Sequence, residues 1–550
     1  MLSAISLAAI AALLASSVAA AQHATNTASF SAVDFAAPSV VGASSTVFAV
    51  TAAPFRARCD AKTGPNGYLS GSDDTEPIQA AFNAARAAGG GTVLLPGPDN
   101  SGHTGKCAVS HPIFGGFDNT TLAGAGKYAS ELVAMPNFTV QRDRTPYSLE
   151  SLQYRPILDL DLPQAPVKPY NLGQPPLVNF TMRDVGFDPR AAQSGGVTGT
   201  VIISIRALQY FNADNVGFDL GGTPTTRDLT KAWQAFSFQA LQFDAHNATH
   251  DLTFRGVSCH NGVGCVILRS DAGCAVPEAP VSDTLSNVRI ENESDVVDLP
   301  HLEDDRDAFT LDFCGTGNPL FTNYVNTGES ITVANSVSDG SVNGLKIEAS
   351  AGGRITHLTY SHVRYQGSDH ATYESGHPRG TGGIVGMEDL SKNGTSVQTE
   401  MTFSDIHGNY AAGLSLYPQG SASEPISMTV QDVDLENDMS PYCIGLIATQ
   451  PPSGHDKIHL DRITCSPAPV NAATNKAQGV HMTQIGRAPG AAFTGDVELS
   501  DSTFRGYPTP VYIYPGSGSW RNVIVRNVHW DTGRPVVDRS TQLQGTSPSH

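Results

Sequence analysis

Residues 401–463 contain one six-residue pattern three times: Met-Thr-Phe-Ser-Asp-Ile at 401–406, Met-Thr-Val-Gln-Asp-Val at 428–433 and Ile-His-Leu-Asp-Arg-Ile at 458–463. Apolar and polar residues alternate in each copy, as in a β-strand with one buried face. A polar residue always precedes the closing Val or Ile. The pattern recurs at 180–185, 252–257, 358–363 and 523–528.

A second set of short strands interleaves with the first. Its members have the form apolar-x-apolar and follow Gly, Ala or a turn. They are Val266/Leu268, Phe309/Leu311, Leu345/Ile347, Leu414/Leu416, Leu446/Ala448, Val480/Met482 and Val511/Ile513, with one more starting at Ile384 or Val385. Counted with Ile384, successive members are 43, 36, 39, 30, 32, 34 and 31 positions apart. Two phase-locked strand repeats without helices between them predict a parallel β-solenoid, whereas a β-sandwich predicts no such phase.

A single amphipathic helix is expected ahead of the coils. Asp73-Asp74-Thr75-Glu76-Pro77 has the acidic residues and the proline of a helix start. Gly89-Gly90-Gly91 ends the helix, and Thr92-Val93-Leu94-Leu95-Pro96 follows as a buried strand. The apolar face of the helix consists of Ile78, Ala81, Phe82 and Ala85. Such a helix is suited to cover the open edge of the first coil.

The N-terminus is predicted to be a secretory signal peptide. The apolar run at 7–14 is too short to span a bilayer, and Val18-Ala19-Ala20-Ala21 offers small residues for cleavage. A buried N-terminal helix is the alternative. We therefore expect a signal peptide at 1–21, an N-terminal extension at 22–54, a β-helix domain at 55–530 and a polar tail at 531–550. The expected location is extracellular, or the periplasm in a bacterium.

The eight cysteines suggest disulfides, because an exported chain folds in an oxidising compartment. The local pairs Cys59–Cys107 and Cys443–Cys465 are the most plausible ones. No C-x-x-C spacing occurs, so we expect neither a metal site nor another cofactor. Six sequons fit an exposed surface in a secreted protein. They start at Asn119, Asn137, Asn179, Asn247, Asn292 and Asn393.

The composition excludes several classes of protein. With 33 basic and 52 acidic residues, the net charge of −19 argues against nucleic acid or an anionic membrane as partner. Charged residues make up 15% of the chain, which also holds 54 Gly and 35 Pro, so a coiled coil or helical bundle is excluded. We expect a monomer whose partner is a polysaccharide substrate.

Residues 55–126 resemble the opening of the right-handed parallel β-helices of the pectate-lyase superfamily. The resemblance rests on Asp73-Asp74-Thr75, on the Gly89–Pro96 stretch quoted above and on Leu122-Ala123-Gly124-Ala125-Gly126. It implies an all-β fold, a right-handed single-stranded parallel β-helix with a short N-terminal capping helix. It does not specify the reaction, because polygalacturonases, lyases, epimerases and phage depolymerases all share this opening.

Two later coils resemble the polygalacturonase family, glycoside hydrolase family 28. Residues 262–270 (GVGCVILRS) are similar to that family's G-D-D-C-I-A-I-K-S, and residues 343–348 (NGLKIE) to its N-G-L-R-I-K. Val263 and Gly264 replace the paired aspartates, and Lys346-x-Glu348 replaces the R-x-K pair. The family's His-Gly coil would fall near Asp307. The catalytic carboxylates of the family are therefore not carried over, and a divergent enzyme is implied.

Alternation along the strands nevertheless places other carboxylates together. If Phe309 and Leu345 face the core, Asp312 and Glu348 face outward on neighbouring coils, about 5 Å apart at the strand spacing. Glycosidases need two carboxylates, and repulsion between stacked ones favours keeping a proton on one of them. The alternative interpretation is purely structural: the acidic run at 303–307 is a solvated turn, and Lys346 forms a salt bridge with its neighbours. The predicted catalytic residues are Asp312, Glu348, Asp307 and Lys346.

Sugar binding requires flat rings for stacking and polar groups for hydroxyls. Outward positions of the same face supply both, although aromatic side chains on a solenoid also simply cover the next coil. The predicted substrate-binding residues are Arg269, Arg306, Tyr417, His481 and Tyr512.

Three functions stay open at this point. The first is a secreted glycoside hydrolase acting on a pectin-like or other cell-wall or extracellular glycan. The second is a polysaccharide lyase or epimerase in which Lys346 or an arginine removes the C5 proton of a uronic acid. The third is a non-catalytic carbohydrate-binding solenoid, which the loss of aspartates at Val263 and Gly264 favours.

Overall fold

The computed structural model divides into units Met1–Gly42 and Ala43–His550, and the described residues all lie in the second unit. They are 46–138, 156–160, 176–194, 201–206, 208–221, 234–239, 249–262, 264–270, 284–296, 307–314, 327–340, 343–350, 353–367, 383–389, 397–420, 423–440, 442–448, 455–469, 478–484, 492–493, 496–513, 519–520 and 523–530.

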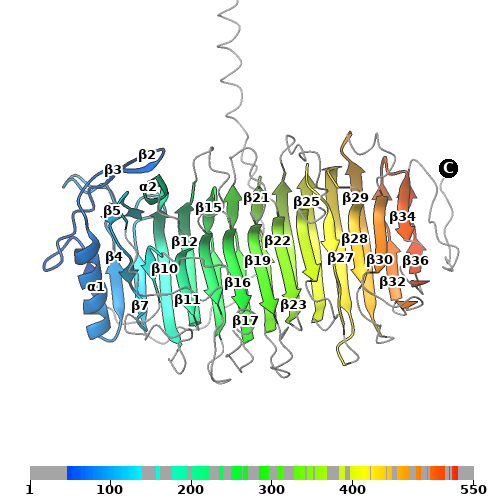
Figure 1. The fold of residues 1–550 in the computed structure, drawn as a ribbon, viewed down its shortest axis with the longest axis horizontal. Helices are drawn as coiled ribbons and strands as arrows, with labels where there is room; N and C mark the ends of the chain where they lie inside the picture. Colours follow the sequence, from blue (N-terminus) through cyan, green and yellow to red (C-terminus); the bar gives the residue numbers. More distant parts are fainter. Residues whose placement is uncertain are drawn as a thin grey trace, which may run out of the picture. The chain divides into compact units, whose positions relative to one another are not determined.

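Two long parallel sheets make up the fold of the described residues (Figure 1). The larger sheet contains β1 (Val47–Ala49), β4 (Gly91–Leu94), β5 (Lys106–Val109), β7 (Thr120–Ala123), β8 (Glu131–Ala134), β10 (Leu177–Asp188), β12 (Leu208–Asp219), β14 (Thr249–Arg255), β15 (Ser258–His260), β17 (Thr284–Glu291), β18 (Ser294–Val296), β20 (Thr327–Ala334), β21 (Val337–Asp339), β23 (Arg354–Gln366), β25 (Val397–Asn409), β27 (Ser427–Asp438), β29 (Lys457–Pro467), β32 (Asp496–Ser500), β33 (Thr503–Phe504), β36 (Val523–Arg526) and β37 (His529–Trp530).

The smaller sheet contains β6 (Ile113–Phe114), β9 (Leu158–Asp159), β11 (Val201–Arg206), β13 (Gln234–Gln239), β16 (Gly264–Ser270), β19 (Asp307–Cys314), β22 (Asn343–Ser350), β24 (Gly383–Asp389), β26 (Leu414–Leu416), β28 (Tyr442–Ala448), β30 (Gln478–Gln484) and β34 (Thr509–Ile513). The remaining elements are a hairpin of β2 (Lys62–Gly64) and β3 (Gly67–Ser70), the pair β31 (Ala492–Phe493) and β35 (Ser519–Trp520), and helices α1 (Thr75–Ala87) and α2 (Arg190–Ser194).

The chain alternates between the two sheets, and each strand pairs in parallel with the strand of the next coil. The six-residue pattern lies in the larger sheet, and the apolar-x-apolar set forms the smaller one, so the predicted parallel β-helix is confirmed. The apolar residues of both sets meet inside the coils and form one continuous core. Val385, rather than Ile384, is the register partner of Leu345 and Leu414, which settles the open phase.

A left-handed backbone residue bends each coil of the larger sheet. In most coils it occupies the position before the closing Val or Ile of the six-residue pattern, and in three coils it precedes Glu293, Ser336 or Ser502 instead; φ lies between 47° and 63°. Asn and Asp tolerate this conformation best among residues that have a side chain, which explains the recurring polar residue. The corner residues are Asp184, Asn215, Gly256, Asn292, Asn335, His362, Asp405, Asp432, Arg462, Asp501 and Asn527.

Helix α1 packs against β1, β4 and β6 at the first coil (Figure 1). Its bounds agree with the predicted helix, and the four predicted apolar side chains are buried. The buried Asp74 carboxylate accepts hydrogen bonds from the N–H groups of Arg58 and Cys59, at 2.6 and 2.9 Å. Strand β1 lies within the segment expected as an extension and pairs with β4, so the first coil already includes residues before 55.

Disulfides join Cys59 to Cys107, Cys443 to Cys465 and Cys259 to Cys265 within the described residues. The first two confirm the predicted local pairs, and the third was not predicted. Such bonds are typical of proteins that fold in an oxidising compartment. Among the described helices, none has the length and apolar character needed to cross a membrane.

Candidate functional site

One row of residues crosses four neighbouring strands of the smaller sheet. Arg269 of β16 is the register partner of Asp312 in β19, Asp312 pairs with Glu348 in β22, and Glu348 pairs with Glu388 in β24. The predicted stacking of Asp312 on Glu348 is therefore confirmed at the level of the backbone. Adjacent strands lie about 4.8 Å apart, so three carboxyl-bearing residues follow one another at that spacing.

Lys346 and Glu348 form an ion pair on β22. Nζ of Lys346 lies 2.8 Å from Oε1 of Glu348, and each side chain is only 14% exposed. Residues two positions apart on one strand share a face and lie about 6.6–7 Å apart at their Cα atoms, so the flexible lysine closes the remaining gap. The pair is therefore largely withdrawn from solvent.

A second row runs through Lys346 itself. Its successive partners are Thr310, Lys346, Gly386, Ser415, Gly445, His481 and Tyr512. His481 and Tyr512, predicted for substrate binding, therefore share the register row of the catalytic candidate Lys346. Five strand spacings separate Lys346 from Tyr512, about 24 Å along the sheet.

The remaining predicted residues have different surroundings. Tyr417 is partly buried and packs against the core, which agrees with an aromatic residue that covers the next coil. Asp307 is the first residue of β19 and pairs with Gly264 and Asn343, five positions before Asp312. Arg306 lies outside the described residues. The side chains of Arg269, Asp307, Asp312, Glu388 and His481 also lie outside the described part of the structure.

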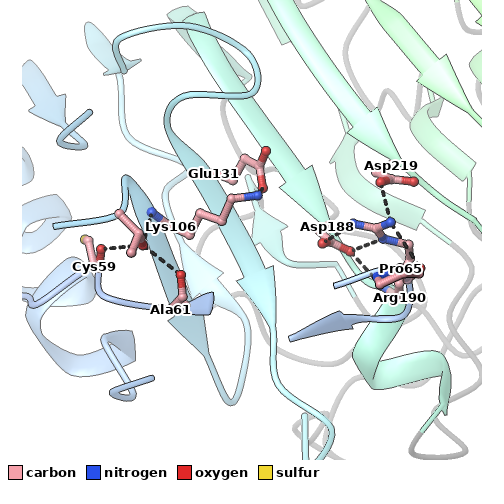
Figure 2. A network of polar contacts seen from close by, with 9 residues as sticks. Cys59, Ala61, Pro65, Lys106, Glu131, Asp188, Arg190 and Asp219 are labelled. Carbon is pink, nitrogen blue, oxygen red and sulfur yellow. Dashed lines mark hydrogen bonds and ion pairs between the residues drawn. The ribbon is translucent and has the colours of Figure 1, made fainter. Parts of the chain in front are cut away.

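A second polar constellation lies where strands of the larger sheet end (Figure 2). Arg190 donates from Nε and Nη2 to the two carboxylate oxygens of Asp188, at 2.9 and 2.8 Å. Its Nη1 lies 2.7 Å from Oδ2 of Asp219 and 3.2 Å from the carbonyl oxygen of Pro65. Arg190 is 18% exposed and Asp188 only 1%, so this fork fixes a buried carboxylate and joins two coils to the β2–β3 hairpin.

The same constellation includes an acid–base pair and a histidine. Lys106 Nζ donates to Oε2 of Glu131 at 2.7 Å, and burial raises the pKa of Glu131 although Lys106 opposes that shift. On the next coil, Nδ1 of His260 lies 3.3 Å from Oδ1 of Asp219. Figure 2 shows Glu131, Asp188 and Asp219 on the neighbouring strands β8, β10 and β12, with Arg190 at the start of α2.

Sequence reasoning missed this constellation, although a signal was present. Residues 184–188 (DVGFD), 215–219 (NVGFD) and 256–260 (GVSCH) are aligned copies of one pattern. Their third positions, Gly186, Gly217 and Ser258, are register partners, and so are Asp219 and His260 at the fifth position. Asp188, the fifth residue of the first copy, directly follows Phe187, the partner of Phe218. A polar residue repeated at the strand ends could have pointed to this network, in which Asp188 is buried while Asp219 and His260 are partly exposed.

Two groups of described residues have the ligand types for a metal ion. They are Cys59, Asp74 and Cys107, and Cys259, Cys265 and Glu293. In both groups the cysteines are joined as a disulfide, so their sulfurs are not thiolates. Glu293 is fully buried, and its burial together with nearby Asp295 raises its pKa well above the usual range. A neutral carboxyl is a poor metal ligand.

No family model matches the chain, and no curated protein matches it. Gene product 12 of bacteriophage phi29 is similar in structure at 13% identity and a TM-score of 0.49, and the match covers 91% of this chain. The chain spans 55% of the length of that phage protein.

Two enzymes of known structure are also similar in the course of the chain. The family 28 exopolygalacturonase of Yersinia enterocolitica is 11% identical, with a TM-score of 0.43. The match covers 92% of this chain and 77% of the exopolygalacturonase chain. The A-module of the mannuronan C-5 epimerase AlgE6 of Azotobacter vinelandii has 14% identity and a TM-score of 0.40, covering 92% and 99%. At such identities and TM-scores, these similarities assign no activity to this chain.

Proposed function

We propose that the chain is a secreted carbohydrate-active enzyme that hydrolyses the glycosidic bonds of a polysaccharide. The observation that carries the proposal is the row in which Asp312 and Glu348 are register partners, with Arg269 and Glu388 on either side. Glycosidases use two carboxyl groups about 5–5.5 Å apart for retention and about 6.5–9.5 Å apart for inversion. One strand spacing, about 4.8 Å, falls near the first range.

The ion pair on β22 supports a division of roles between the two carboxyl groups. Lys346 lies 2.8 Å from Glu348, and we assign Glu348, which has this cation beside it, the role of nucleophile or base. Asp312, on the neighbouring coil, is then the acid that protonates the leaving oxygen. Arg269, in the row of the two carboxyl groups, and His481 and Tyr512, in the row of Lys346, are proposed to bind sugar hydroxyls together with Arg306 and Tyr417. Asp307, the first residue of β19, is a further candidate for catalysis.

The test is a panel of extracellular polysaccharides treated with the purified protein, with reducing ends and ultraviolet absorbance read together. A hydrolase releases reducing ends without absorbance, and both Asp312→Asn and Glu348→Gln reduce that release by about 100-fold or more. Glu329→Gln is the matched control, because Glu329 is a half-exposed glutamate on β20 of the larger sheet. Full activity in both amide variants would contradict the assignment of the site.

A non-catalytic glycan-binding solenoid is the second candidate. The observation in its favour is the near-burial of Lys346 and Glu348, since a desolvated ion pair is also a plain structural feature. This candidate predicts binding of a polysaccharide with no new reducing ends, and unchanged binding in Glu348→Gln. A lyase centred on Lys346 would instead give an absorbing unsaturated product, but a lysine held in an ion pair is a poor base.

A further inference from the structure

The loop at 124–130, between β7 and β8, lies against the larger sheet at a row in which two successive residues are glycines. Glu131, Gly186, Gly217, Ser258 and Ser294 are successive partners in that row. A Cβ atom at Gly186 would lie 2.0 Å from the carbonyl oxygen of Lys127. A Cβ atom at Gly217 would lie 3.0 Å from Cε1 of Tyr128 and 3.1 Å from Cβ of Lys127. The two glycines thus make room for Lys127 and Tyr128.

Both loop residues reach the first side chain after the glycines. Nζ of Lys127 donates to Oγ of Ser258 at 2.5 Å and to the carbonyl oxygen of Gly256 at 3.2 Å. The hydroxyl of Tyr128 is also hydrogen-bonded to Ser258. Burial lowers the pKa of Lys127, and in the described part of the chain this lysine forms no ion pair despite the net charge of −19. Lysine, tyrosine and serine therefore meet at one oxygen atom.

The surroundings of Ser258 are polar and open to solvent. Tyr128 is 57% exposed, and His260, two positions after Ser258 on β15, is 39% exposed. The amide Nδ2 of Asn261 lies 3.1 Å from Nε2 of His260, whose Nδ1 lies near Asp219. Arg190 in turn fixes Asp219. Hydrogen-bonding groups thus lie beside the serine, on strand ends held by the network of Figure 2.

We propose that Ser258 is a nucleophile, that Lys127 is its general base, and that this second site hydrolyses acyl esters of alcohols. A serine hydroxyl beside a lysine is one of the recurring arrangements for acyl transfer. A site whose tyrosine is 57% exposed suits a small acyl group on an accessible hydroxyl, for example an acetyl ester.

The steps balance without a cofactor. Neutral Lys127 takes the proton of Ser258 as Oγ attacks the ester carbonyl. The bond from carbonyl carbon to alkoxy oxygen then breaks, and Lys127 returns the proton to the leaving alcohol. Water next attacks the acyl-serine, Lys127 takes a proton from that water and gives it back to Oγ, and the acid is released. Tyr128 positions the serine hydroxyl through its own hydrogen bond.

The experiment uses the full-length protein, 4-nitrophenyl acetate as substrate and a fluorophosphonate as a serine-directed probe. We expect nitrophenol release and covalent labelling of the wild type. Both should fall by about 100-fold or more in Ser258→Ala and in Lys127→Arg, because arginine keeps the charge but accepts no proton. Tyr128→Phe should lose less, about 10-fold. Ser294→Ala, the next residue of the same row, is the matched control and should keep the wild-type rate.

Two results would overturn the proposal. One is hydrolysis or labelling that survives in Ser258→Ala at the wild-type level. The other is the absence of both in wild-type protein whose circular dichroism shows a folded β-sheet. Since neither reagent contains a sugar, the outcome does not depend on the polysaccharide assay proposed for the smaller sheet.

Discussion

Nζ of Lys346 and Oε1 of Glu348 lie 2.8 Å apart on one strand, and both side chains are almost withdrawn from solvent. Removing one partner leaves the other charge desolvated, whereas removing both leaves no such charge. We therefore expect each single variant, Lys346→Met or Glu348→Gln, to lose more than half of the unfolding free energy that the double variant loses. The coupling energy from the double-mutant cycle should be about 1–3 kcal/mol. Urea unfolding of the four proteins measures it, and additive effects would show that the pair contributes nothing.

Arg190 is expected to be essential for stability in the first coils. Replacing it with Met leaves the carboxylate of Asp188, 1% exposed, without the guanidinium that binds both its oxygens. Loss of one partner from such a pair costs about 3–5 kcal/mol. Arg183→Met is the control, because Arg183 is an exposed arginine on β10, the strand that ends at Asp188. Urea midpoints compare the two variants, and equal midpoints would refute a structural role for the fork.

Other left-handed residues of the larger sheet, outside the corners, predict where β-branched residues destabilise the fold. Ser330 on β20 has φ 54°, and it is exposed, so no packing is lost on substitution. Ser330→Val should cost about 1–2 kcal/mol, because a branched Cβ clashes with the backbone in this conformation. Thr332→Val, two positions along the same strand, should stay within about 0.5 kcal/mol. Equal effects in chemical denaturation would contradict the left-handed conformation of Ser330.

The buried Asp438 predicts that stability falls as the pH rises. Burial raises the pKa of Asp438 to about 7, although Tyr507 and Ser440 donate hydrogen bonds to its carboxyl group. An unfolded aspartate ionises near pH 4, so between about pH 4 and 7 the folded state binds a proton that the unfolded state releases. This contribution is complete below pH 4 and is lost by pH 7, at a cost of about 4 kcal/mol.

Asp438→Asn removes that titration and keeps an acceptor for the Ser440 N–H group. We expect the melting temperature of this variant to depend less steeply on pH between 4 and 7 than that of the wild type. Asp434→Asn is the control, because Asp434 is a half-exposed aspartate on the same strand. Parallel pH profiles for wild type and Asp438→Asn would remove Asp438 as the cause.

The sequence predicts those parts of the molecule that repeat. Alternation of apolar residues located the strands of both sheets, and the same phase placed Asp312 beside Glu348 without any knowledge of coil geometry. The constellation at Ser258 was not predictable in this way. Lys127 reaches Ser258 across 131 residues, and the contact depends on two glycines that leave room for an irregular loop. Repeats fix which strands are neighbours, but they carry no information about where a loop docks.

The rows of the smaller sheet have a further consequence for any polymer that lies along them. Backbone hydrogen bonds set the pitch of a row at about 4.8 Å, whatever side chains it carries. Arg269, Asp312, Glu348 and Glu388 are successively 43, 36 and 40 positions apart in the chain, yet their register is unbroken. The sheet therefore presents equivalent positions at one constant spacing. If the repeat of a bound polymer differs from this spacing by about 0.5 Å, the mismatch reaches about half a strand spacing after about five coils. Only a polymer whose repeat matches the spacing meets equivalent groups along the whole face.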